Sequence, residues 1–167
     1  MTNDFFSNRL VFRQRFFATL LGLLASMLAP QAFPQSINDV TLNVYKEETC
    51  GCCVGWIDHM TQHNYKSNIF HPANIALVKA ELGIKPQWQS CHTAVTEDGY
   101  VFEGHIPAKF ISQFLADPPQ NALGLTVPGM PIGGPGMEIG NRVTPYDILL
   151  MTKDGSHEVY ASIKSAA

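Results

Sequence analysis

Three cysteines occupy four consecutive positions of this chain, in the run Cys50-Gly51-Cys52-Cys53. The run follows a short strand-like segment over residues 40–46 and opens a stretch in which apolar residues recur at helical spacing. A helix amino terminus carries partial positive charge and free N–H groups, which favour the thiolate form of a cysteine. Because thiolate is both a nucleophile and a metal ligand, this placement predicts either a soft-metal site or a redox dithiol.

The rest of the chain alternates strand-like and helix-like patterns, which predicts an α/β fold with a central mixed sheet and flanking helices. A dithiol between the first strand and the first helix is the thioredoxin-like placement. Thr49 is the expected N-cap of that helix, and residues 120–144, rich in Gly and Pro, are expected to form a long loop without a regular element. The patterns predict strands over 40–46, 66–70, 91–96, 100–105, 146–152 and 157–163, and helices over 52–64, 72–82 and 107–116.

The amino terminus predicts export. Arginines precede an apolar run over residues 16–25, and small residues follow, which is the pattern of a secretory signal peptide over residues 1–35. The run is shorter than the roughly 20 residues of a membrane-spanning helix, although an uncleaved anchor is the alternative. We therefore expect a single exported domain over residues 38–167 that meets the membrane only through the signal segment. With a net charge of −3 and scattered basic residues, nucleic acid is not an expected partner.

A fourth cysteine, Cys91, changes the balance between the two chemistries. A redox dithiol needs only Cys50 and Cys53, which are spaced as Cys-x-x-Cys. Cys52 and Cys91 are better explained by metal, because soft thiolates select Cu(I) and, by geometry, Zn²⁺. The remaining alternative is a structural bridge from Cys91 to Cys50 or Cys53, with spare thiols.

Two histidines flank the predicted hairpin that Cys91 begins. His92 follows Cys91 directly, so the two side chains point to opposite faces of a strand and reach one ion only where the backbone bends. His105 ends the next strand and is expected to approach them across the hairpin. Each is a candidate ligand, the alternative being a hydrogen-bonded histidine at a strand end. Glu103 is expected either to orient one of these histidines or to be solvated.

Two further pairs of residues have weaker signals. Met130 and Met137 lie on the Gly/Pro-rich loop, where a thioether could serve Cu(I) or could anchor the loop on the core. His59 and His63 are four apart on the first predicted helix and share a face. For these histidines a solvated face is the preferred interpretation over a metal site.

The motifs together resemble a known family. Over residues 40–163 the ordered set resembles the CopG-like metal-binding proteins, long catalogued as a domain of unknown function. The motifs that carry the resemblance are Cys50-Gly51-Cys52-Cys53 with Trp56, Ser90-Cys91-His92-Thr93-Ala94, Gly99-Tyr100-Val101 with Glu103-Gly104-His105-Ile106-Pro107-Ala108, Gly124-Leu125, Val127-Pro128-Gly129-Met130-Pro131 and Pro135-Gly136-Met137-Glu138. One departure is Gly134 before Pro135, where the family often has Ser.

The resemblance implies a thioredoxin-like fold, residence in the bacterial periplasm and a role in copper handling or resistance. It implies that the four cysteines are copper ligands, with both hairpin histidines as candidates at the same site, and it places the two methionines in family motifs. The resulting ligand set is Cys50, Cys52, Cys53, Cys91, His92, His105, Met130 and Met137.

The expected function is therefore that of a periplasmic copper-binding protein of metal resistance. It would hold Cu(I), with Cu(II) and redox cycling as further expectations and zinc as the less favoured metal. Its expected partners are copper ions and other periplasmic copper-handling proteins. The alternative from another class is a thiol–disulfide oxidoreductase that uses Cys50 and Cys53, although Pro86 is the nearest candidate for the cis-proline that such enzymes place opposite the dithiol.

Overall fold

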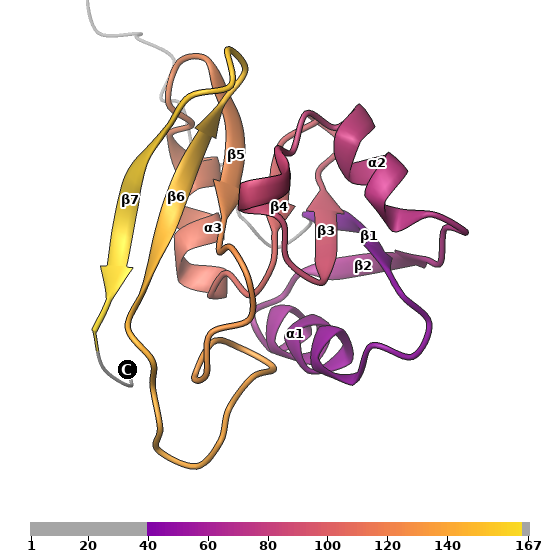
Figure 1. Ribbon diagram of the computed structural model, residues 1–167, viewed down its shortest axis with the longest axis vertical. Helices are drawn as coiled ribbons and strands as arrows, with labels where there is room; N and C mark the ends of the chain where they lie inside the picture. The colour runs from indigo at the N-terminus through magenta and orange to yellow at the C-terminus, as the bar shows by residue number, and fades with distance from the viewer. Residues whose placement is uncertain (1–39, 165–167) are drawn as a thin grey trace, which may run out of the picture. The chain divides into compact units, whose positions relative to one another are not determined.

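The computed structural model describes residues 40–164, and the predicted signal peptide over residues 1–35 lies outside them. A mixed seven-stranded sheet in the order β2-β1-β3-β4-β5-β6-β7 forms its centre (Figure 1). The pairs β1–β2 and β4–β5 are parallel, and the other neighbours are antiparallel. The strands are β1 Thr41–Lys46, β2 Lys66–Phe70, β3 His92–Val95, β4 Val101–Glu103, β5 Ala122–Thr126, β6 Tyr146–Thr152 and β7 His157–Ile163. The predicted α/β class with a mixed sheet is confirmed.

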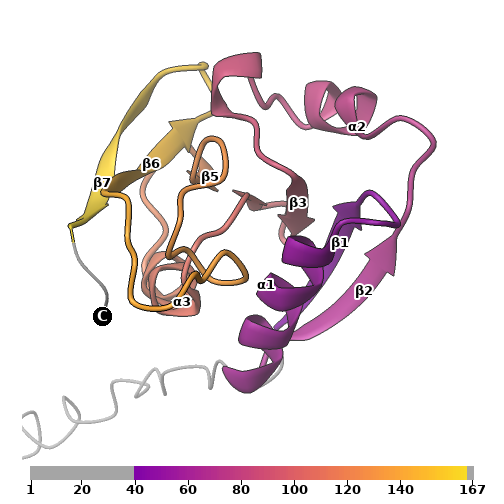
Figure 2. The same ribbon diagram turned by 60° about the horizontal axis from the view of Figure 1, so that its bottom comes forward.

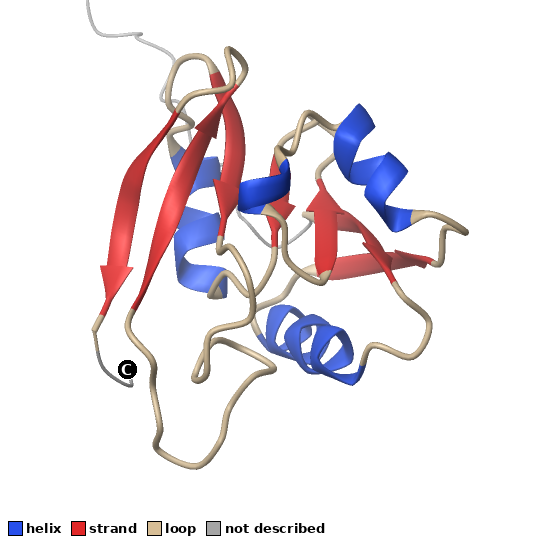
Figure 3. Ribbon diagram, in the orientation of Figure 1, coloured by secondary structure: helices blue, strands red, loops and turns tan. Residues whose placement is uncertain are grey.

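Helices cover both faces of this sheet, as Figure 3 shows. On one face α1 and α3 enclose the larger core, which includes Trp56, Phe102 and Phe114. On the other face lie α2 and the short 3-10 helix η2, whose Trp88 belongs to a smaller cluster. The helices are α1 Gly51–Gln62, α2 Ile75–Glu81, η2 Pro86–Trp88 and α3 Ala108–Ala116. Within the described residues no helix is long and apolar enough to cross a membrane.

The strand β1 shows how the sequence builds the α1 face. Its residues alternate between partly and fully buried, and Leu42, Val44 and Lys46 are the buried set. Because side chains alternate across a strand, these three point to the same face, where Leu42 and Val44 pack in the core with Trp56 of α1. Figure 2 shows α1 lying along β1 and β2, on the side of the sheet away from α2.

The prediction of a loop over residues 120–144 is wrong at its beginning, because β5 occupies Ala122–Thr126. Gly124 interrupts the apolar sequence pattern of this strand. A Cβ built on Gly124 would lie 1.7 Å from the carbonyl oxygen of Val101, its partner on β4, so the close approach of two strands requires glycine there. The remaining segment holds only an isolated bridge between Ile139 and Arg142 among the described residues.

Other elements were predicted with shifted ends. The helix expected over 72–82 begins at Ile75, because Asn74 caps it by accepting a hydrogen bond from the Leu77 amide at 3.2 Å. The first helix is capped at Cys50 rather than at Thr49, and no side-chain hydrogen bond supports that cap. The two hairpin strands are shorter than predicted, which leaves Cys91 and His105 just outside regular structure.

Candidate metal centre

The helical cysteines lie where β1 turns into α1. The amide of Cys50 donates to the carbonyl of Glu47 at 3.1 Å, which closes the turn, and Cys50 then forms the N-cap of α1. Cys52 and Cys53 follow in the first helical turn. The N–H groups of this turn and the helix dipole favour negative charge on the sulfur atoms.

Two of the helical cysteines are joined. Cys50 and Cys53 form a disulfide, whereas Cys52 and Cys91 are free thiols. The bridges considered from the sequence, which join Cys91 to Cys50 or Cys53, are therefore not the pairing found. The pair that is joined is the one spaced as Cys-x-x-Cys.

Cys91 brings the distant part of the sequence to the helical cysteines. Its sulfur lies 3.8 Å from the sulfur of Cys52, and the sulfur of Cys53 lies 3.9 Å from the Cys91 carbonyl oxygen. All four cysteine sulfurs lie within 4.8 Å of one another. A single soft ion could therefore contact donors from α1 and from the segment before β3, as the sequence predicted.

A second donor set shares the Cys91 sulfur. It consists of Cys91, His92 and His105, whose ligand atoms also lie within 4.8 Å of one another. The Cys91 sulfur is 3.4 Å from Nδ1 of His92 and 3.0 Å from Nε2 of His105. Cys91 precedes β3 in a bend, and this bend lets neighbouring residues reach the same point. The backbone therefore bends at the point where Cys91 and His92 need a bend in order to reach one ion.

His105 is held in one tautomer. Its Nδ1 is 2.8 Å from the carbonyl oxygen of Pro135, which can only accept, so Nδ1 carries the proton. The other ring nitrogen, Nε2, is then an acceptor directed at Cys91. Burial lowers the pKa of His105, against the opposing effects of the Pro135 carbonyl and Glu138. A neutral imidazole with a fixed tautomer is the form that ligates metals.

His92 is fully buried between two rings. Its ring lies 4.5 Å from that of Trp56 and 5.0 Å from that of His105, measured between centroids. Trp56 is itself fixed, because its Nε1 donates to the Ile106 carbonyl at 2.9 Å. Burial, then His105 and Lys79, lower the pKa of His92 well below its ordinary value. Nδ1 of His92 faces the Cys91 sulfur, whereas Nε2, the other ring nitrogen, has no hydrogen-bond partner.

The thiol of Cys91 is neutral without a metal. Burial, together with the neighbouring Cys52, raises the pKa of Cys91 to about 12. An ion that binds here must therefore displace a proton from Cys91, and metal affinity should rise with pH. Soft sulfur donors and neutral imidazoles together fit a copper or zinc ion.

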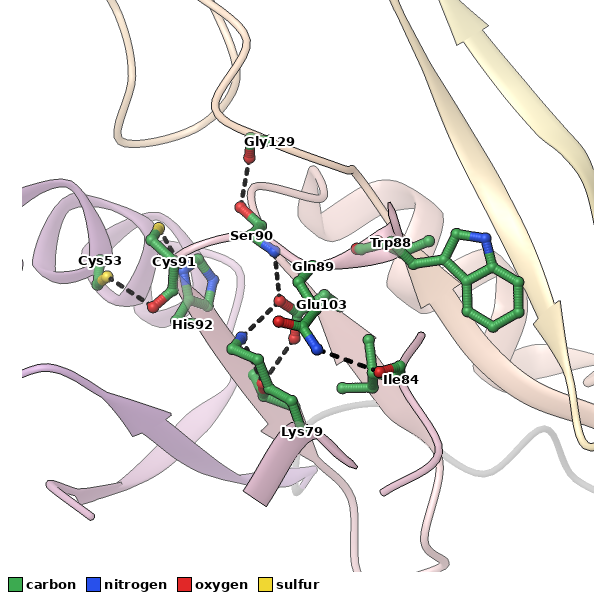
Figure 4. A network of polar contacts seen from close by, with 12 residues as sticks. Cys53, Lys79, Ile84, Trp88, Gln89, Ser90, Cys91, His92, Glu103 and Gly129 are labelled. Atoms are coloured by element: carbon green, nitrogen blue, oxygen red, sulfur yellow. Dashed lines mark hydrogen bonds and ion pairs between the residues drawn. The ribbon is translucent and has the colours of Figure 1, made fainter. Parts of the chain in front are cut away.

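A buried polar network on the other face of the sheet supports Cys91 (Figure 4). Oε1 of Glu103 accepts from the Ser90 amide at 2.6 Å and from Nζ of Lys79 at 2.5 Å. Oε2 accepts from the Thr93 hydroxyl at 2.5 Å. Glu103 is therefore neither solvated nor bonded to a described histidine, which corrects both expectations for it. It therefore bonds both residues that flank Cys91 and His92: the backbone of Ser90 and the side chain of Thr93.

The Gly/Pro-rich loop packs against both parts of the site. Gly136 has a positive φ of 82°, and a Cβ there would lie 2.4 Å from the Cys52 carbonyl oxygen, so only glycine allows the loop to approach α1 this closely. The next residue, Met137, is partly buried, whereas Met130 is 57% exposed. Their role as ligands stays a prediction.

His59 has a role that the sequence did not suggest. Its Nε2 accepts a hydrogen bond from the Ala108 amide at 3.0 Å, at the first residue of α3, and its ring lies against that of His63. His59 therefore ties α1 to the start of α3 rather than lying on a solvated face. Both histidines line a cavity of about 270 Å³ that Glu138 and Tyr146 also border.

Comparison with known proteins agrees with this geometry. The family described as "Protein of unknown function, DUF411" matches residues 88–137, which include Cys91, His92, His105 and both loop methionines. Two solved structures named copper resistance protein copG, Form 1 and Form 2, are each 35% identical to this chain with a TM-score of 0.71. Each covers 75% of this chain, which in turn covers 98% of Form 1 and 99% of Form 2. No curated protein matches the chain.

Proposed function

Because this chain belongs to the CopG family of copper resistance proteins, we propose that it binds copper where the cysteine cluster meets the two hairpin histidines. One observation carries the proposal: the Cys91 sulfur belongs to both donor sets, so the thiols of α1 and the imidazoles form one continuous site. The proposed ligands are Cys50, Cys52, Cys53, Cys91, His92 and His105, with Met130 and Met137 as additional thioether donors.

The donor types indicate which copper ions the site would hold. Four sulfur atoms favour Cu(I), and sulfur can bridge several such ions. The imidazoles of His92 and His105 accept either oxidation state, so Cu(II) is also a proposed occupant. Zinc would be satisfied by four thiolates, but it gives the neutral histidines no role.

The disulfide supports a redox function in addition to binding. We propose that the joined cysteines exchange electrons with copper at the same site. Two Cu(II) ions would take one electron each from the dithiol of Cys50 and Cys53, giving two Cu(I) ions, the disulfide and two protons. The reverse step would oxidise two Cu(I) ions and reduce the disulfide. Cys52 and Cys91, which stay free, would keep the metal bound in either state.

Export to the periplasm completes the proposal. The predicted signal peptide over residues 1–35 and the family's role in copper resistance support this location, where the copper site would exchange ions with other copper-handling proteins.

Copper stoichiometry tests the binding proposal. We would reduce the purified protein without oxygen, load it with Cu(I) and measure the bound metal for the wild type, Cys52→Ala and the control Met60→Leu, which changes a buried residue on the same helix. Cys52→Ala should sharply lower the copper bound, whereas Met60→Leu should not. Equal stoichiometry in all three proteins would contradict the proposal.

A thiol–disulfide oxidoreductase is the second candidate function, and the Cys50–Cys53 disulfide is the observation that favours it. Against it, no peptide bond among the described residues is cis, so Pro86 does not supply the expected cis-proline. Reduction of insulin that depends on Cys50 and Cys53, combined with copper binding that survives Cys52→Ala, would favour this function over ours.

A further inference from the structure

Lys46 is a buried cation for which residues 40–164 supply no counter-ion. It is 2% exposed, at the end of β1, in the position where the alternation of Leu42 and Val44 calls for an apolar residue. Its ammonium donates to two backbone carbonyls, those of Glu47 at 2.8 Å and Glu48 at 3.2 Å. No carboxylate of the described residues pairs with it.

The comparison with Lys79 makes this unusual. Lys79 is equally buried, at 3% exposed, but it forms an ion pair with Glu103 at 2.5 Å. A buried charge without an opposite charge is costly, because carbonyl groups replace only part of the lost hydration. Met or Leu at position 46 would fill the same space without that cost. The lysine therefore suggests that negative charge reaches this place in the working protein.

Two observations link Lys46 to residues of the sulfur site. Its ammonium and the Cys50 amide bind the same oxygen, that of Glu47. Across the sheet Lys46 pairs with His92 on β3, so the two side chains share the α1 face, where His92 meets Trp56.

We propose that Lys46 is the built-in counter-ion of the thiolate cluster, and that it favours the reduced, copper-bound state of the site. Four thiolates that hold one Cu(I) keep a net negative charge, and two or three Cu(I) ions bridged by the same four thiolates neutralise it only in part. The disulfide form carries less charge and needs the cation less. Lys46 is thus a positioning and electrostatic residue, not a ligand. The expected effect on the copper-bound state rests on the proposed copper function. The expected effect on the metal-free dithiol does not.

Two substitutions separate the charge from the hydrogen bonds. Lys46→Gln keeps a donor for the carbonyls of Glu47 and Glu48 without the charge, and Lys46→Met removes both. Lys153→Met, at an exposed lysine in the β6–β7 turn, is the control with the same change in net charge. For each full-length protein we would measure Cu(I) affinity against a chromophoric chelator, the reduction potential of the Cys50–Cys53 disulfide without metal, and the melting temperature.

Lys46→Gln and Lys46→Met should each weaken Cu(I) binding about tenfold. Each should also lower the disulfide potential by about 30 mV, which is the same tenfold change for a two-electron couple. Lys46→Met should leave the melting temperature of the disulfide form unchanged or raised, because a buried unpaired charge is removed. Lys153→Met should change none of these.

Two results would overturn the proposal. If Lys46→Gln keeps the Cu(I) affinity and the disulfide potential of the wild type, the charge of Lys46 has no role. A lowered melting temperature for Lys46→Met with an unchanged potential would make Lys46 only a cap for the 47–50 turn. The potential is measured without copper, so it tests Lys46 even where the wild type fails to bind Cu(I), a result that would instead contradict the proposed function.

Discussion

The two halves of the candidate metal centre are built in different ways. The helical half, Cys50 to Cys53, is a local structure: one turn, one helix start and a disulfide between residues three apart. The hairpin half, Cys91, His92 and His105, depends on contacts between distant segments, including Glu103 on β4 and Pro135 on the loop. In the proposed redox function the helical half would change its covalent state, because it holds the Cys50–Cys53 disulfide, while the hairpin half would stay fixed.

The strongest test of this division is Cys91→Ser, because Cys91 belongs to both donor sets. We expect Cu(I) affinity to fall more than about a hundredfold, since even residues that only orient a ligand typically contribute 10–100-fold. Competition with a chelator measures it. The disulfide of Cys50 and Cys53 should still form, and thiol titration checks this. Equal losses from Cys91→Ser and from an exposed change such as Ser162→Ala would contradict the shared role.

Glu103→Gln should disrupt the hairpin half by leaving the Lys79 ammonium buried and unpaired. Breaking one partner of a buried ion pair costs about 3–5 kcal/mol, and urea unfolding would measure the loss. The double variant Lys79→Met/Glu103→Gln should recover part of it, because no buried charge then remains. The potential of the Cys50–Cys53 disulfide should not change, and a shift as large as that of Lys46→Gln would show that the two halves are not separate.

Lower pH should destabilise the metal-free protein through the hairpin half. The pKa of His92 is lowered in the folded state by burial, so the unfolded chain binds the proton that the folded chain excludes. This histidine's contribution is therefore complete above the unfolded pKa, near 6.5, and is lost as pH falls below it. We expect stability to fall from pH 7.5 to pH 5, with a slope from His92 of at most about 1.4 kcal/mol per pH unit, by urea unfolding.

A matched pair of histidine variants tests whether His92 causes this pH dependence of stability. His92→Phe should remove much of the pH dependence, whereas His157→Gln, at an exposed position, should keep it. An unchanged slope in His92→Phe would assign the effect to other groups.

The loop that joins the halves gives the next prediction. Gly136→Ala places a Cβ 2.4 Å from the Cys52 carbonyl at a positive φ, whereas Gly129→Ala has a positive φ but open space around the Cβ. We expect losses of roughly 2–3 kcal/mol for Gly136→Ala and about 1 kcal/mol for Gly129→Ala. The difference in melting temperature reports the cost of moving the loop away from α1, and equal losses would mean that this contact is dispensable.

The smallest expected effect concerns Met130. Because this side chain is largely exposed, Met130→Leu should change stability by less than about 0.5 kcal/mol. As a proposed thioether donor it should still lower Cu(I) affinity a few-fold in chelator competition. No change in affinity would remove Met130 from the ligand set.

What the sequence could predict follows from the same contrast. The strand, cysteine turn and first helix were predictable because their pattern is local, and the β6–β7 hairpin because apolar periodicity and a Lys-Asp-Gly turn coincide. The strand β5 was missed because Gly124, required by the approach of β4, interrupts its pattern. The meeting of Cys91 with the helical cysteines was predicted from sulfur chemistry rather than from periodicity.

The supporting contacts were beyond such reasoning. Nothing near Glu103 in the sequence indicates that it bonds the Ser90 amide, because that bond depends on how the hairpin folds. The sequence pattern indicates that Lys46 is the polar end of a strand, whereas the structure shows that its side chain is buried. The role of His59 at the start of α3 likewise depends on how two helices meet.

The position of the Cys91 sulfur, common to both donor sets, has a kinetic consequence for any copper ion that binds here. Such an ion could pass from the thiols to the imidazoles by exchanging its bonds to the other ligands one at a time, while its bond to the Cys91 sulfur persists. The transfer would be a stepwise ligand substitution inside the protein, with no release of a bare or hydrated ion to the solvent.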